Sequence, residues 1–150
     1  MSELNVIQNF IGNKKVALIG VSRSNAKFGN AILKDLTKRG YQVFPIHSEI
    51  SNIDGIVCYN SLSGIPDGVE NLIISAKPDK AEKIIPEAAK SKIKRIWLQQ
   101  GSSSENVIRL CKENNIDFVQ KRCILMFAEP VDSIHKFHRF IWKIFGQLPK

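Results

Sequence analysis

Short apolar runs alternate along this chain with longer segments in which apolar residues recur every three or four positions. The first run lies within residues 15–20 and has the length of a strand buried on both faces of a parallel sheet. In residues 25–39, the side chains of Phe28, Ile32 and Leu36 are spaced by four, as on one face of a helix. The two patterns predict a strand followed by an amphipathic helix.

The same alternation continues through most of the chain. Further strands are predicted over 41–46, 69–75, 95–99 and 117–120, and further helices over 78–92, 102–115 and 131–145. Pro86 lies inside the first of these helical segments, and we expect a kink there or a break into two short helices. Ser102 and Glu105 have the spacing of a capping box, which predicts that the next helix begins there.

Alternating strands and helices predict an α/β fold, a doubly wound Rossmann-like parallel sheet of about five strands with flanking helices. A length of 150 residues with 43% apolar residues suits one domain with one core. We expect residues 14–128 to form this core and residues 129–150 to add a C-terminal helical extension. In such folds the strand-to-helix loops meet at the carboxyl edge of the sheet, so ligand sites are expected there.

Several classes of protein are disfavoured by the composition. The apolar runs fall well short of the roughly 20 residues of a membrane span, and the N-terminus does not read as an export signal, so a cytoplasmic location is expected. Cys58, Cys111 and Cys123 are odd in number and contain no Cys-x-x-Cys pair, so we expect reduced thiols. His135 and His138 have no third ligand in view, and no metal site is predicted.

The net charge of +8 is concentrated in the second half of the chain. Residues 1–75 contain seven basic and six acidic residues, whereas residues 76–150 contain fifteen basic and eight acidic residues. This excess favours an anionic partner, which leaves a phosphorylated small molecule, a nucleic acid or an acidic surface as alternatives.

The loop after the first strand has the features of a phosphate site. Gly20 and Ser22 are small residues before a predicted helix N-terminus, whose amides bind anions, and the Ser22 hydroxyl is a further donor. Arg23 and Lys27 add positive charge. The alternative is a tight turn with two solvated bases. The loop does not match Gly-x-Gly-x-x-Gly, because Ser22 and Asn25 stand where glycines are required and the next glycine is Gly29.

The end of the second predicted strand bears on the choice of nucleotide. NAD-binding domains place an acidic residue there, whereas this chain reads Pro45-Ile46-His47, and Glu49 follows slightly later. Pro45 is suited to packing against adenine, and His47 can bond a ribose or phosphate, or can be an ordinary surface histidine. NAD is therefore disfavoured, with Glu49 as the residue that would have to bind the ribose.

Three other loops contain candidate residues. Ala76 and Lys77 can admit a nucleotide edge and a phosphate, or simply begin a helix. Gln100 and Gly101 can fix a polar ligand chain, or cap the sheet edge. Cys123 follows Arg122, whose charge can lower the pKa of the thiol, although a free cysteine is more often a small buried apolar residue.

A family resemblance rests on five segments of the chain. They are Gly20-Val21-Ser22-Arg23 with Lys27 and Gly29, residues 40–45, residues 59–62, residues 97–101, and Arg122-Cys123. With these segments the chain resembles the stand-alone CoA-binding domain family, related to the Rossmann-like CoA-binding domain of succinyl-CoA synthetase and of NDP-forming acyl-CoA synthetases. The resemblance covers about residues 16–123. It departs from the family's frequent Pro-Val-Asn-Pro at His47 and Ser48.

The resemblance implies coenzyme A as the ligand. It implies a phosphate cradle over residues 20–29, adenosine contacts at Pro45 and His47, and a groove lined by Ala76, Lys77, Gln100 and Gly101. The cradle comprises Gly20, Val21, Ser22, Arg23, Lys27, Phe28 and Gly29. The ligase relatives also use separate domains, which carry a phosphorylated histidine and bind a nucleotide, and 150 residues are too few to hold them.

These observations favour a small cytoplasmic protein that binds CoA or acyl-CoA, as a binding module rather than an enzyme. The alternatives are an NAD(P)-binding redox or sensor domain, and an enzyme that exchanges thiols or disulfides with CoA through Cys123. Nucleic-acid binding is a further and disfavoured alternative, because it rests only on the basic second half of the chain. The apolar stripe of residues 134–145 is expected to pack on the sheet or on a second subunit in a homodimer.

Overall fold

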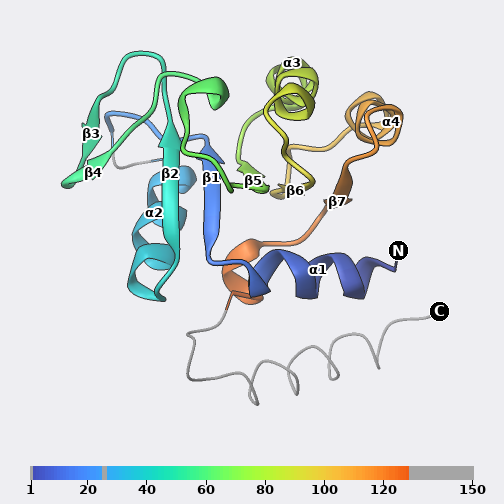
Figure 1. The fold of residues 1–150 in the computed structure, drawn as a ribbon, viewed down its shortest axis with the longest axis horizontal. Helices are drawn as coiled ribbons and strands as arrows, with labels where there is room; N and C mark the ends of the chain where they lie inside the picture. Colours follow the sequence, from blue (N-terminus) through green and yellow to red (C-terminus); the bar gives the residue numbers. More distant parts are fainter. Residues whose placement is uncertain (1, 25–26, 129–150) are drawn as a thin grey trace.

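A computed structural model describes residues 2–24 and 27–128, which form a five-stranded parallel sheet with helices on both faces (Figure 1). The strand order is β2-β1-β5-β6-β7. These strands are β1 (Lys15–Ile19), β2 (Gln42–Ile46), β5 (Asn71–Ile74), β6 (Arg95–Leu98) and β7 (Asp117–Val119). All four pairings are parallel, which confirms the predicted α/β class and the five-stranded sheet. The helix predicted over 131–145, with its apolar stripe and the histidine pair, lies outside the described residues.

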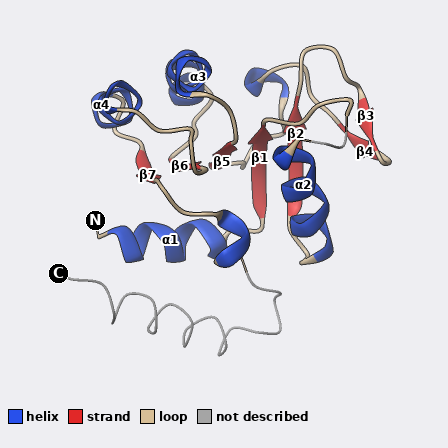
Figure 2. Ribbon diagram, turned by 180° about the vertical axis from the view of Figure 1, so that it is seen from behind, coloured by secondary structure: helices blue, strands red, loops and turns tan. Residues whose placement is uncertain are grey.

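Two helices cover each face of the sheet (Figures 1 and 2). Helices α1 (Glu3–Gly12) and α2 (Phe28–Lys38) cover one face, and α3 (Pro78–Lys90) and α4 (Glu105–Glu113) cover the other. Alternate residues of the strands point to opposite faces, so each strand supplies both apolar layers. In the first layer, Trp97 is fully buried with its ring 5.4 Å from that of Phe10 and 5.6 Å from that of Phe127. Because both faces of the sheet are covered by helices, nearly every residue of the inner strands is apolar.

The strand order places a topological switch point between β1 and β5. The first connection leads from β1 to β2 on one side, and the chain then returns to add β5 on the other side of β1. Ligands of open α/β sheets bind at such a point, beyond the carboxyl ends of the strands. The loops after β1 and β5 are therefore the expected walls of a site.

Two elements were not predicted from the sequence. Helix α1 begins after the N-cap residue Ser2, whose side chain accepts a hydrogen bond from the Asn5 amide, and it buries four apolar residues on the sheet. A two-stranded hairpin, β3 (Asn52–Ile53) and β4 (Ile56–Val57), follows β2. The turn residues Asp54 and Gly55 have positive φ angles of 49° and 85°, as is typical of an Asp-Gly turn in a hairpin.

Helix boundaries correct three details of the sequence prediction. Helix α2 begins at residue 28 rather than 25. Helix α3 is continuous through Pro86, which is exposed, so the Glu82 carbonyl that loses its helical partner lies on the solvent side. Helix α4 begins after Ser104, whose side chain accepts from the Val107 amide at 3.1 Å, and not at Ser102. Short 3-10 turns η1 (Leu62–Gly64) and η2 (Ile124–Met126) complete the described chain. None of its helices combines the length and apolar character that a membrane crossing requires.

Candidate functional site

The loop after β1 is pressed against the end of β5. Gly20 has a φ of +130°, and a Cβ placed on it would lie 2.9 Å from Ser75 Cβ and would overlap the Ser75 carbonyl oxygen. A side chain at this position would therefore force the two loops apart. The switch point depends on a glycine at residue 20.

The N-terminus of α2 is packed equally closely on this loop. A Cβ on Gly29 would lie 2.5 Å from the Gly20 carbonyl carbon and 3.0 Å from the Val21 nitrogen. In the first turn the Asn30 amide donates to the Lys27 carbonyl at 3.1 Å, and the N-cap residue Lys27 provides no side-chain cap for the Phe28 and Gly29 amides. The positive end of the helix dipole therefore faces the loop, an arrangement that can attract an anion.

The loop backbone is held by a side chain that sequence reasoning did not single out. The Ser22 amide donates to Asn30 Oδ1 at 2.8 Å, and Asn30 Nδ2 donates to the Ser22 carbonyl at 2.9 Å. Asn30 is buried, with 7% of its surface exposed. The Ser22 hydroxyl, predicted as a phosphate donor, donates here to the Ser24 carbonyl at 2.6 Å. Nothing in the local sequence distinguishes this asparagine from an ordinary helix residue.

The charged and aromatic residues of the loop are open to solvent. Arg23 and Lys27 are exposed, and half of the Phe28 surface is exposed at the start of α2. Arg23 Nη2 lies 3.9 Å from Glu49 Oε2, and both side chains are more than 70% exposed. The loop after β2 therefore brings a carboxylate to the predicted phosphate cradle.

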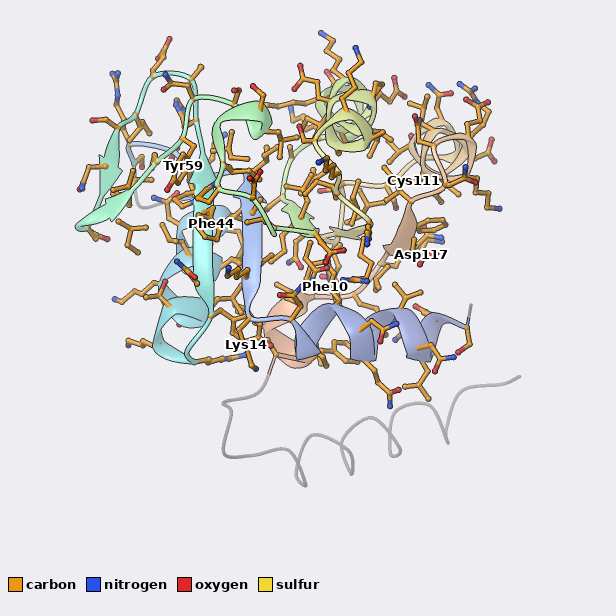
Figure 3. The ribbon with its side chains drawn as sticks, viewed as in Figure 1. Phe10, Lys14, Phe44, Tyr59, Cys111 and Asp117 are labelled. Atoms are coloured by element: carbon orange, nitrogen blue, oxygen red, sulfur yellow. The ribbon has the colours of Figure 1, made fainter. Side chains whose placement is uncertain are left out.

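The end of β2 is covered by the segment around Tyr59. The Tyr59 amide donates to the Pro45 carbonyl and the His47 amide donates to the Tyr59 carbonyl, both at 2.9 Å. The Tyr59 ring lies 5.9 Å from the Phe44 ring (Figure 3). Pro45 itself is buried, whereas His47 is half-buried and its Nδ1 accepts from the Glu49 amide at 3.0 Å. Solvent is reached at this end by His47, Ser48 and Glu49.

The loops after β5 and β6 are joined by a buried serine. The Ala76 amide donates to Ser102 Oγ at 3.1 Å, and the Ser102 amide donates to the Gln99 carbonyl at 2.9 Å. Ser102 is 1% exposed, so this contact belongs to the folded core rather than to a helix cap. Lys77 at the start of α3 and the Gln100-Gly101 turn remain exposed beside it. The predicted lining residues are thus held on one rigid edge.

Cys123 lies farther along the same edge of the sheet. Gln99 is buried, its Oε1 accepts from the Ile124 amide at 2.8 Å, and its Nε2 lies 3.5 Å from Cys123 Sγ. The neighbouring Arg122 donates through Nε to Glu3 Oε1 at 2.8 Å. The predicted partner of the thiol is therefore engaged with α1, and Gln99 is the polar side chain that contacts the sulfur.

The structure places the predicted residues that it describes in a row along the carboxyl edge of the sheet. Residues 20–24 and 27–29 lie at the switch point with residues 75–77 beside them, the His47 region lies on one side, and Gln100-Gly101 lies on the other. Cationic and amide donors at one part of the row suit phosphates, and neutral groups farther along suit an uncharged chain. Among the described residues, no three histidine, cysteine or acidic side chains are grouped to hold a metal ion.

Comparison with known proteins identifies one family. The profile described as "CoA binding domain" matches residues 14–129. The acetate–CoA ligase (ADP-forming) of Methanocaldococcus jannaschii is 29% identical over 119 residues, which are 74% of this chain and 17% of the ligase. This chain therefore spans about a fifth or less of the length of such ligases.

Solved structures show the same fold. A conserved hypothetical protein from Pyrococcus furiosus is 33% identical, with a TM-score of 0.72 over 75% of this chain and 97% of that one. A hypothetical protein from Pyrococcus horikoshii is 23% identical, with a TM-score of 0.77 over 94% of this chain and 93% of that one. The architecture is thus shared with small proteins of about the same length.

Proposed function

Since this chain belongs to the CoA-binding domain family, we propose that it binds CoA or an acyl-CoA, with the phosphates at the loop after β1. The observation that carries the proposal is the close junction of Gly20 and Gly29, which presents the N-terminus of α2 at the switch point of the sheet. Arg23 and Lys27 flank this junction and are exposed, so both can reach a phosphate group.

The remainder of CoA fits the rest of the row. We propose that the adenosine lies toward His47 and Phe28, which present the exposed ring surfaces beside the loop. The pantetheine chain would then follow Ala76, Lys77 and the Gln100-Gly101 turn. The hydrogen bonds through Ser102 hold these two loops at a fixed separation, which supports a preformed site.

CoA accounts for the β2 end better than NAD(P) does. An NAD site needs a carboxylate directed at the ribose hydroxyls at the end of the second strand. His47 stands there, and the nearby Glu49 carboxylate is directed toward Arg23. NAD(P) binding is therefore the alternative that the binding experiment must distinguish from CoA binding.

A second candidate function is thiol exchange through Cys123. It is favoured by one observation, that Cys123 is only partly buried at the carboxyl edge while Cys58 and Cys111 are buried. In this reaction the Cys123 thiolate attacks a sulfur of CoA disulfide, forms a Cys123–CoA disulfide and releases one CoA thiolate. The check is a mass increase on Cys123 with CoA disulfide that dithiothreitol reverses and that Cys123→Ser abolishes.

The primary test is binding, measured by thermal shift and by calorimetry with CoA, dephospho-CoA, acetyl-CoA, NAD and NADP in parallel. A ligand that binds only the native state raises the melting temperature by mass action. We expect a rise with the CoA compounds alone, and a smaller rise with dephospho-CoA if the 3′-phosphate is bound. A rise with NAD or NADP alone would overturn the proposal.

Charge reversal locates the phosphates. Arg23→Glu combined with Lys27→Glu is expected to abolish the CoA response in a folded protein. The control is Lys34→Glu combined with Lys83→Glu, because both side chains are exposed on helices and the net charge changes by the same amount. Equal CoA affinity in the two double variants would show that the phosphates bind elsewhere.

A further inference from the structure

We propose that Asn30 is a positioning residue that fixes the phosphate loop before any ligand arrives. The inference rests on the proposed function, because it concerns the site assigned to the CoA phosphates. Asn30 is the third residue of α2, and the preceding Gly29 is packed against the loop backbone. Its side chain therefore reaches the loop without leaving the helix.

The contact of Asn30 with the loop resembles the pairing of two extended backbones. Its carboxamide accepts from the Ser22 amide at 2.8 Å and donates to the Ser22 carbonyl at 2.9 Å. These two groups lie on the two sides of one residue, so the bonds fix the orientation of both peptide units. Because Asn30 is 93% buried, water competes poorly for either bond.

This arrangement determines which donors remain for a phosphate. The Ser22 amide is already used by Asn30, and the Ser22 hydroxyl donates to the Ser24 carbonyl. Within the first turn of α2 the Asn30 amide donates to the Lys27 carbonyl at 3.1 Å. A phosphate at the described part of the loop would therefore meet the Phe28 and Gly29 amides and the side chains of Arg23 and Lys27. Asn30 thus shapes the cradle without contacting the ligand.

The energetic consequence is preorganisation. A loop that is ordered only on binding lowers the apparent affinity by the cost of ordering it, whereas a preformed loop does not. We expect Asn30→Ala to weaken CoA binding by about tenfold, which corresponds to about 1.4 kcal/mol. We also expect the Ser22 amide to exchange with solvent at least about tenfold faster in this variant without CoA.

The matched control is Asn71, another buried asparagine with two such bonds. Asn71 Nδ2 donates to the Phe10 carbonyl and Asn71 Oδ1 accepts from Arg95 Nε, both at 2.7 Å, at the amino end of β5. Asn71→Ala is expected to lower stability without changing either the exchange of the Ser22 amide or the CoA affinity measured below the unfolding transition. It therefore separates loop positioning from a general loss of stability.

The experiment combines amide hydrogen exchange by NMR with calorimetric titration of CoA. Asn30→Asp is the second variant, because its carboxylate still accepts from the Ser22 amide but does not donate to the Ser22 carbonyl. We expect it to keep slow exchange at Ser22 and to bind CoA more weakly, because it brings a negative charge near the phosphates. It also provides a reporter if Asn30→Ala does not fold.

Three results would overturn the inference, and they differ from failure of the proposed function. Unchanged Ser22 exchange in Asn30→Ala would show that the side chain does not fix the loop. Fast exchange with unchanged CoA affinity would show that fixing the loop does not matter for binding. A large shift of the Ser22 amide signal on CoA binding to the wild type would show that the ligand takes this donor. Absence of CoA binding by the wild type would instead reject the proposed function, and with it any role of Asn30 in positioning a CoA site. The exchange data would still decide whether Asn30 orders the loop.

Discussion

At the scale of single residues, Arg23 lies between a carboxylate and the proposed phosphate site. Arg23 Nη2 is 3.9 Å from Glu49 Oε2, and solvent exposure of both groups makes the pair weak. In the proposed site the phosphate competes with Glu49 for this cation. We expect Glu49→Gln to increase CoA affinity by about two- to fivefold at low salt, measured by calorimetry, with the gain reduced as salt is added.

The same variant separates CoA from NAD. If Glu49 bound a ribose, its replacement by glutamine would lower NAD affinity rather than raise CoA affinity. Glu113→Gln is a suitable control, because Glu113 pairs with Arg109 at 2.7 Å on α4, away from the loop after β1. A loss of CoA affinity in Glu49→Gln would mean that this carboxylate contributes to binding.

The three cysteines are expected to differ strongly in reactivity. Burial raises the pKa of the Cys111 thiol to about 12 and also raises the pKa of the Cys58 thiol, so both are protonated at pH 8. Cys123 is less buried and contacts Gln99 Nε2. We expect iodoacetamide at pH 8 to modify Cys123 at least about tenfold faster than Cys111, because the thiolate reacts. Peptide mapping by mass spectrometry measures the modification rate of each cysteine. In urea-unfolded protein the three cysteines should react at similar rates. Modification of Cys111 before Cys123 in the folded protein would contradict the structure.

The sequence identifies some site residues better than others. Gly20 and Gly29 could be recognised because a glycine before and within the start of a helix has a local steric meaning. Asn30 and Ser102 could not, because their partners are backbone groups of other loops that the fold alone brings near them. The sequence also could not show that Arg122, the neighbour of Cys123, donates to Glu3 on α1, because these residues are far apart in the chain.

At the scale of elements, the junction of α2 with the loop after β1 is one of the two tightly packed contacts of the site. Gly29→Ala places a methyl group 2.5 Å from the Gly20 carbonyl carbon, so the helix must move away from the loop. We expect a loss of about 1–3 kcal/mol in the free energy of unfolding, measured in urea, together with weaker CoA binding.

The control for this prediction is Gly12→Ala at the end of α1, where a Cβ meets no atom within 4 Å. We expect this change to be neutral or to stabilise the protein by up to about 1 kcal/mol, because alanine is the better helix residue. Equal effects of the two substitutions would show that the α2 junction tolerates a side chain.

An ion pair joins the starts of β5 and β6. The hydrogen bond from Lys94 Nζ, at 2.8 Å, is the main cause that lowers the pKa of Glu70, against a smaller opposing effect of burial. Because the pKa of Glu70 is lower in the folded state than its ordinary value of 4.5, the ion pair stabilises the folded protein at pH values above 4.5. This stabilisation is lost as the pH falls through the pKa of Glu70 in the folded state. Because Lys94 is 66% exposed, the contribution at pH 7 stays below about 1 kcal/mol.

Glu70→Gln should therefore be slightly less stable than the wild type at pH 7 and equally stable at pH 3, in urea titrations at both values. Glu87→Gln, a change at an exposed position on α3, should not alter stability at either pH. A difference between Glu70→Gln and the wild type that persists unchanged at pH 3 would show that the glutamate acts by packing rather than by charge.

The elements with a strong periodic pattern were the ones that could be predicted. All residues of β5 are buried, and its apolar run of residues 72–74 predicts an inner strand. Helix α1 was missed although Val6, Ile7, Phe10 and Ile11 are spaced for one buried face. The hairpin was missed because its strands have only two residues each, so the Asp-Gly turn was its main signal.

At the scale of the whole molecule, one group of basic residues lies at the edge of the sheet opposite the proposed site. The helices of a βαβ fold end at the amino edge of the sheet, where basic residues complement their dipoles. Lys90, Lys92 and Lys94 lie there, beside a groove of 410 Å³ between the end of α3 and the loop before β5. These three lysines of the described chain thus lie at the opposite edge of the sheet from residues 20–29.

This separation predicts a moderate salt dependence of ligand binding. A small phosphorylated ligand at the carboxyl edge meets only a few cations, chiefly Arg23, Lys27 and Lys77. Calorimetry should then show that CoA affinity falls by about tenfold or less between 50 and 200 mM salt. A nucleic acid bound along the edge that carries Lys90, Lys92 and Lys94 would release many counterions, and its affinity would fall by about 10³- to 10⁵-fold over the same range of salt. A steep loss for CoA would require the phosphates to contact the amino edge as well, and Lys90→Ala would then weaken CoA binding as much as Lys27→Ala does.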